Sequence, residues 1–163
     1  CEAQADALVL LRPWNEIGLS QRLRQHGKLE SEKVLRRIHN ELGGWAWLLD
    51  HLSDAWGAND DPLPALDALS ERLHETAFRT QFQKACGLGI HPAGDQVLST
   101  IIREKQVPQD LLVPEVLGEQ VSLAECSAAV EYLMRMGLIQ EQTHGSQIDV
   151  VPNELFARLA MLA

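Results

Sequence analysis

Short apolar segments with helical spacing, several of them ended by glycine, run through most of this chain of 163 residues. Within residues 31–42, for example, the apolar side chains recur at intervals of one, three or four: Val34, Leu35, Ile38 and Leu42. This spacing puts them on one face of a helix, and the glycine pair that follows favours its end. The 26 Leu and 17 Ala also outnumber the 21 β-branched Val, Ile and Thr. The sequence therefore predicts a mainly α-helical protein.

The first half of the chain is predicted to be a helical bundle. The apolar periodicity and the helix-ending residues predict helices over residues 15–26, 31–42, 45–56 and 64–86. An apolar run at residues 7–12, closed by Pro13, is typical of a short buried strand. The glycine-rich turn at residues 87–92 breaks the pattern, so we expect one domain over residues 1–90 and a second over 91–163.

The second half combines helices with one predicted hairpin. Ser122 and Glu125 have the spacing of a capping box, so they predict the start of a helix that Gly137 ends. Strands are predicted on both sides of the Thr-His-Gly-Ser sequence at residues 143–146. The full order is helices at 94–105, 109–117 and 122–137, strands at 138–142 and 147–151, and a last helix from 152. Three helices followed by a hairpin predict a winged helix-turn-helix domain with a small β-hairpin wing.

The charge of this second half argues against DNA binding. The whole chain has a formal net charge of −9, and residues 95–163 hold four Lys and Arg against ten Asp and Glu. A DNA-reading helix needs cations and amides that reach phosphates and base edges. The helix at 122–137 offers Glu125, Tyr132 and Arg135 instead, so we predict that these three residues contact another protein. DNA remains the alternative partner, disfavoured by this acidity.

Motifs for catalysis or metal binding do not occur in this sequence. It has no phosphate-binding loop, and its six His lack the spacing of paired metal ligands. We therefore predict no catalytic residue, no metal site and no cofactor held by this chain alone. Three cysteines cannot all pair, and two of them, Cys86 and Cys126, lie in apolar helical patterns, which favours a reducing, cytoplasmic setting. No apolar stretch approaches the length of a membrane span.

The first residue, Cys1, predicts that the chain is part of something longer. A piece of a larger protein is one explanation, and a mature lipoprotein that begins at a lipidated cysteine is the other. The apolar run begins at Leu8, so the chain has no flexible linker of the kind that usually follows a lipidated cysteine. We therefore favour a piece of a larger protein.

Two segments carry a resemblance to a known family. Leu8 to Trp14, and then the sequence Arg-Arg-Ile-His-Asn-Glu-Leu-Gly-Gly-Trp at residues 36–45, resemble the last core strand and the helical lid of AAA+ and STAND P-loop ATPases. In that family a Thr-Gly-Gly-x-Pro motif begins a lid helix close to the nucleotide, and a winged helix often follows. This sequence departs from the motif, with Leu42 in place of Thr and Ala46 in place of Pro.

The resemblance implies a function for nearly the whole chain. It would be the non-catalytic, C-terminal lid and winged-helix region of a larger ATPase that binds ATP elsewhere and contacts another protein or the rest of that ATPase. The residues it places near nucleotide are Arg36, Arg37, Gly43, Gly44 and Trp45. Two alternatives remain open from the sequence: a stand-alone winged-helix regulator that binds DNA, and a purely structural assembly subunit.

Overall fold

The computed structural model describes residues 13–25, 27–28, 31–57, 61–108 and 121–160. Within these ranges the chain forms eight helices and three short strands, which confirms the prediction of a mainly helical protein. The helices are α1 (Glu16–Gln25), α2 (Glu32–Leu42), α3 (Ala46–Trp56), α4 (Leu63–Arg72), α5 (Thr76–Ala85), α6 (Gly94–Glu104), α8 (Leu123–Met136) and α9 (Glu154–Ala160). The predicted strand at 7–12 and the predicted helix at 109–117 lie outside the described residues.

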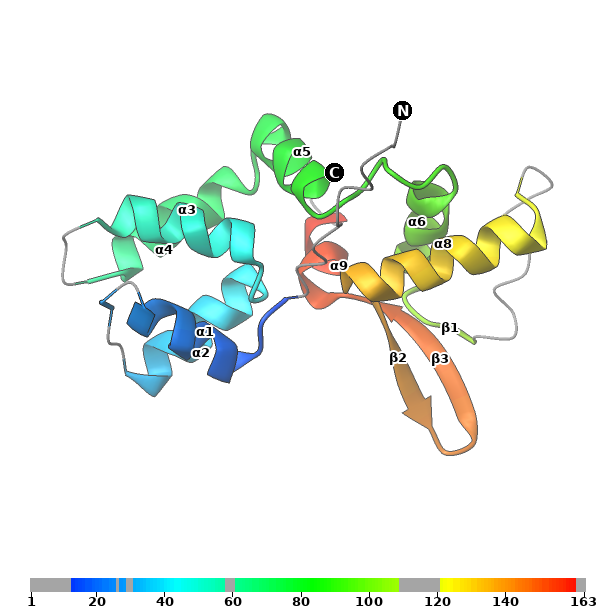
Figure 1. Cartoon of the computed structure of the whole chain (residues 1–163), viewed down its shortest axis with the longest axis horizontal. Helices are drawn as coiled ribbons and strands as arrows, with labels where there is room; N and C mark the ends of the chain where they lie inside the picture. The colour runs from blue at the N-terminus through cyan, green and yellow to red at the C-terminus, as the bar shows by residue number, and fades with distance from the viewer. Residues whose placement is uncertain (1–12, 26, 29–30, 58–60, 109–120, 161–163) are drawn as a thin grey trace, which may run out of the picture.

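The helices form two groups that meet at the centre of the molecule. Figure 1 shows α1 to α4 on one side, α6, α8 and the strands on the other, and α9 between them. The buried apolar side chains of both groups belong to one cluster. At its centre the ring of Trp45 lies edge-on to Phe82 and Phe156, with centroids 5.8 and 5.5 Å away. Apolar burial thus joins the segments 13–90 and 91–160.

The strands form a small antiparallel sheet of order β1-β3-β2. The hairpin of β2 (Ile139–His144) and β3 (Gln147–Pro152) confirms the predicted pair of strands and extends it toward the turn. Only Gly145 and Ser146 connect them, and Gly145 has a φ of 63°, which a tight hairpin turn requires. The third strand, β1 (Val107–Pro108), has two residues and was not predicted, because so short a segment carries no periodicity.

The predicted ends of helices α2 and α8 are confirmed. Ser122 and Glu125 form a complete capping box, in which the Ser122 hydroxyl accepts from the Glu125 amide and the Glu125 carboxylate accepts from the Ser122 amide. Gly43 and Gly137 end α2 and α8 in the left-handed conformation. Local sequence therefore fixes both ends of these two helices.

The single helix predicted over residues 64–86 is wrong. The structure has two helices there, α4 and α5, separated by Leu73, His74 and Glu75. No glycine or proline marks the break, so no local pattern predicts it. The change of direction brings Phe78 of α5 against Trp47 of α3, with ring centroids 5.1 Å apart. Tertiary packing of these aromatic side chains outweighs the helical propensity of the segment.

Gly44 provides a test of how tightly the chain packs at the start of the described region. Gly44 has a φ of 71°, and a Cβ there would lie 1.9 Å from the Trp14 carbonyl oxygen. Gly27 has a similar φ of 73°, but nothing lies within 4 Å of its added Cβ. We expect Gly27→Ala to cost about 1 kcal/mol of unfolding free energy and Gly44→Ala about 3 kcal/mol or more. Urea denaturation of both variants measures this, and equal losses would contradict the close contact.

Candidate functional site

The Gly43-Gly44 turn anchors the chain around Trp14. The Trp14 amide donates a hydrogen bond to the Gly44 carbonyl at 2.8 Å. The carbonyl oxygen of Trp14 lies 3.0 Å from Nε2 of His39. The backbone of Trp14 is therefore held by α2 and by the turn after it. A side chain at position 44 would overlap that backbone. The glycine pair therefore has a structural reason that is independent of any ligand.

Trp45, the last of the five predicted nucleotide-adjacent residues, is buried. Only 3% of its surface is exposed, and its indole packs against Phe82 and Phe156. Its Nε1–H has no hydrogen-bond partner although it lies in the core. Trp45 thus acts in the described structure as a packing residue between α3, α5 and α9.

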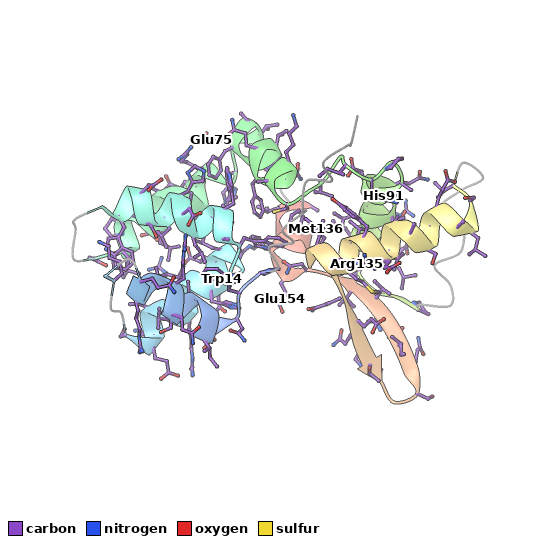
Figure 2. The ribbon with its side chains drawn as sticks, viewed as in Figure 1. Trp14, Glu75, His91, Arg135, Met136 and Glu154 are labelled. Atoms are coloured by element: carbon purple, nitrogen blue, oxygen red, sulfur yellow. The ribbon has the colours of Figure 1, made fainter. Side chains whose placement is uncertain are left out.

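An open groove of about 630 Å³ lies where the two groups of helices meet. Its first side includes Trp14, His39 and Gly43, and its second side includes Glu141 of β2 and Glu154 of α9. Figure 2 shows the labelled side chains of Trp14 and Glu154 near the centre of the molecule. The described residues that line the groove have both polar and apolar side chains, and no Lys or Arg is among them.

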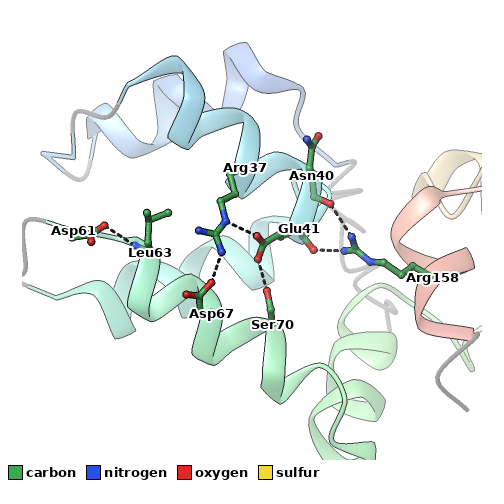
Figure 3. A network of polar contacts seen from close by, with 8 residues as sticks. All are labelled: Arg37, Asn40, Glu41, Asp61, Leu63, Asp67, Ser70 and Arg158. Atoms are coloured by element: carbon green, nitrogen blue, oxygen red, sulfur yellow. Dashed lines mark hydrogen bonds and ion pairs between the residues drawn. The ribbon is translucent and has the colours of Figure 1, made fainter.

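Arg36 and Arg37, which were predicted to lie near nucleotide, are both ion-paired. Arg37 pairs with Glu41 of its own helix at 2.7 Å and also with Asp67 of α4, as Figure 3 shows. The hydrogen bond and charge of Glu41 raise the pKa of Arg37. Arg36 pairs with Glu32 at 2.5 Å, and a more distant carboxylate, that of Glu16, lies 3.8 Å away. Arg37 therefore connects α2 to α4, whereas Arg36 keeps an exposed guanidinium.

Arg158 joins the two groups of helices through a contact that was not predicted. Its guanidinium, on α9, donates to the backbone carbonyl of Asn40 at 3.1 Å and to that of Glu41 at 2.5 Å. These carbonyls belong to the last turn of α2, where a helix leaves acceptors unsatisfied (Figure 3). A cation at this end also complements the helix dipole. No local pattern predicts the contact, because the residues are 117 and 118 positions apart.

Tyr132, one of the three predicted interface residues of α8, makes contacts inside the chain. Its hydroxyl donates to the Gly87 carbonyl at 2.7 Å, and its ring stacks on His91 with centroids 5.7 Å apart. Partial burial and the charge of Asp95 raise the pKa of Tyr132. Tyr132 thus holds α8 against the turn before α6, and its hydroxyl is hydrogen-bonded within the chain.

Glu125 and Arg135 lie on the exposed side of α8. The carboxylate of Glu125 is committed to the capping box, and its bonds with Ser122 lower the pKa of Glu125. Arg135 is 60% exposed and pairs with Glu131 one turn earlier. The structure therefore brings the three predicted interface residues onto one helix, but in three different environments.

Neither described cysteine is arranged as a nucleophile. Cys86 and Cys126 are both free and buried, and burial raises the pKa of each thiol. A protonated, buried thiol reacts slowly. In the described part of the chain no group of three or more His, Cys, Asp or Glu is placed to hold a metal ion. None of the described helices is long and apolar enough to cross a membrane.

Comparison of the chain with protein-family models, curated proteins and solved structures found no match. The resemblance to ATPase lids therefore stays a prediction.

The capping box makes the stability of the fold depend on pH in a defined direction. A carboxylate whose pKa is lowered by folding stabilises the folded state above its ordinary pKa, 4.5 for this group. That contribution is lost as the pH falls through the lowered value. We expect Glu125→Gln to be less stable than the wild type at pH 7 and the difference to shrink below about pH 4.5.

Urea denaturation from pH 7 to pH 3 measures this difference. Glu75→Gln is the matched control, since Glu75 stands at the N-cap of α5 without a side-chain cap bond. A difference between wild type and Glu125→Gln that does not change with pH would contradict the assignment.

Proposed function

We propose that this chain is the lid-like helical and winged-helix region of a larger P-loop ATPase, and that it acts by contacting protein. Residues 13–90 would form the lid and residues 91–160 the winged helix. ATP would be bound elsewhere in the larger protein, and this region would supply no catalytic residue. The observation that carries the proposal is the acidic, cation-poor surface of α8 and of the hairpin of β2 and β3. These are the elements with which a winged helix would contact its partner.

The order of elements in the second half supports a winged helix. Helix α6 is followed by β1, then by α8 and by the hairpin of β2 and β3. The hairpin follows α8 directly through Gly137, and β3 lies between the other two strands. In such an arrangement α8 would be the recognition helix and the hairpin would be the wing.

The surface of these elements supports a protein partner over DNA. On α8, Arg135 is the one Lys or Arg, and it is paired with Glu131. The exposed part of the hairpin, residues 140–148, contains no Lys or Arg and one acidic residue, Glu141. A DNA phosphate is usually contacted by a cationic or amide donor of the protein. A surface with few Lys and Arg therefore has a low affinity for DNA. Leu123, 62% exposed at the start of α8, adds apolar surface of the kind that protein interfaces bury.

Among the two candidate arginines, the ion pairs support Arg36 as the one that meets phosphate. Arg37 bridges α2 and α4, so withdrawing it would weaken the bundle. Arg36 pairs only with exposed carboxylates in the described structure, and such surface pairs contribute little to stability. A guanidinium held so weakly can exchange a carboxylate for a phosphate.

The choice between protein and DNA can be tested directly. We expect fluorescence anisotropy with a labelled random-sequence duplex to detect no binding tighter than about 100 µM, even at low salt. Arg135→Glu should then change nothing, whereas Glu131→Lys, which leaves two cations on α8, should increase affinity for the duplex. Salt-dependent binding by the wild type that Arg135→Glu weakens would overturn the proposal in favour of a DNA-binding regulator.

The lid role is tested in the full-length protein. We expect it to hydrolyse ATP and Arg36→Ala to lower turnover by about tenfold or more, because a positioned cation stabilises transferring phosphate. Arg103→Ala on α6, which removes an exposed arginine paired with its neighbour Glu104, should leave turnover unchanged. Equal turnover in the wild type and Arg36→Ala would contradict a contact between Arg36 and phosphate. A full-length protein without ATPase activity would contradict the lid role.

A further inference from the structure

A separate cavity of about 330 Å³ lies between α2, α4 and α9. Its described lining residues come from the end of α2, from α4 and the link to α5, and from α9: Glu41, Ser70, Leu73, His74, Arg158 and Leu159. None of them lines the open groove between the two groups of helices. Small-molecule sites usually have volumes of about 300–1,000 Å³, so this cavity is large enough for a small ligand.

Two leucines form an apolar wall of the cavity. Leu73 and Leu159 are each only 3% exposed, and both belong to the buried cluster of the fold. The packing of that cluster holds them in place, so the wall exists before a ligand arrives. An apolar group placed against it would be removed from water, which favours binding.

Arg158 supplies a positive charge at the cavity. Its Nη1 and Nη2 donate to the carbonyls of Asn40 and Glu41, which leaves three of the five N–H donors of a guanidinium. Both acceptors are neutral carbonyl groups. Arg158 forms no ion pair with any other described residue, in contrast to Arg37 and Arg135. Its charge is therefore available to an anionic group of a ligand.

The acidic side chain among the described lining residues, that of Glu41, is already bonded. Its Oε1 accepts from Arg37 at 2.7 Å, and its Oε2 accepts from the Ser70 hydroxyl at 2.7 Å, as Figure 3 shows. Each carboxylate oxygen thus has a donor, and the guanidinium of Arg37 offsets the negative charge. Among the described lining residues, Arg158 is then the one whose charge no ion pair offsets.

His74 adds a hydrogen-bonding group to the same cavity. It is exposed and lies in the link between α4 and α5. Its ring forms no hydrogen bond with another described residue, and an imidazole N–H can donate to a carboxylate. A multiply charged ion such as phosphate would gain nothing from the apolar wall, and a neutral apolar molecule would gain nothing from Arg158. The arrangement therefore suits one carboxylate attached to an apolar body.

We propose that this cavity binds a small carboxylic acid with an apolar body. The carboxylate contacts Arg158 and His74, and the apolar body packs against Leu73 and Leu159. A ligand in this position contacts α9 and the end of α4 together, so it stabilises the junction of the two groups of helices.

An NMR titration of the ¹⁵N-labelled 163-residue chain with hexanoate tests the proposal. We expect saturable shifts of the amide signals of residues 70–74 and 158–159, with a Kd below about 10 mM. The matched ligand 1-hexanol keeps the apolar chain and removes the charge. It should bind at least about tenfold more weakly, because it cannot form the charged hydrogen bonds with Arg158.

Variants of His74 test the position of the carboxylate without touching the buried cluster. His74→Glu adds a negative charge beside the ligand and should weaken hexanoate binding by about tenfold. His74→Lys should strengthen it by about threefold or more. His144→Glu and His144→Lys are the matched controls, because they make the same changes at an exposed histidine of the hairpin outside the cavity. They should leave the Kd within about twofold of the wild type.

Arg158→Gln tests the cation itself, since it removes the charge and keeps an amide donor for the carbonyls of α2. It should weaken hexanoate binding by about tenfold and leave hexanol binding unchanged. If this variant does not fold, the His74 pair decides. The proposal is overturned by the absence of hexanoate binding up to about 10 mM, by equal affinities for hexanoate and hexanol, or by equal effects of His74→Glu and His74→Lys. These measurements need neither nucleotide nor a protein partner, so their outcome is independent of the proposed ATPase role.

Discussion

The contact of Trp45 with Phe82 and Phe156 is the interaction on which the rest of this structure depends. These three rings come from the start of α3, from α5 and from α9, and they join both groups of helices in one buried cluster. Gly43 leaves room for this contact, since a Cβ there would lie 3.1 Å from the Trp45 ring and 3.2 Å from Leu155. Once α9 is held there, Arg158 reaches the last carbonyls of α2, and the groove forms between α2, β2 and α9.

Charge is distributed so that most described cations are used within the chain. Arg37 connects α2 to α4, Arg158 caps the C-terminal end of α2, and Arg135 pairs with Glu131 of its own helix. Along α8 and the exposed part of the hairpin, residues 140–148, Arg135 is the one Lys or Arg. The net charge of −9 is unevenly distributed, since residues 95–163 hold four Lys and Arg against ten Asp and Glu.

The sequence predicted most helices because their signals are local. Ser31, Ser122, Gly43 and Gly137 define helix ends through bonds between residues three or four positions apart. The break between α4 and α5 had no such signal, and it was missed. At the Gly43-Gly44 turn the sequence predicted the end of α2 but not the contact with the Trp14 backbone, because that contact spans 30 residues. Tyr132 was expected to face a partner, yet its hydroxyl bonds Gly87, 45 positions away.

By itself, the sequence determined the helical class, most helix ends and the hairpin, since propensity, apolar period and turn residues act over a few neighbouring positions. Only the tertiary structure decided which side chains are available for binding. In the structure Arg158 binds the carbonyls at the end of α2, and the Tyr132 hydroxyl binds the turn before α6. Strand β2 pairs on one side only among the described strands. The physical reason is that burial and hydrogen bonding between distant segments depend on how the helices pack, and that packing is a sum of many weak contacts.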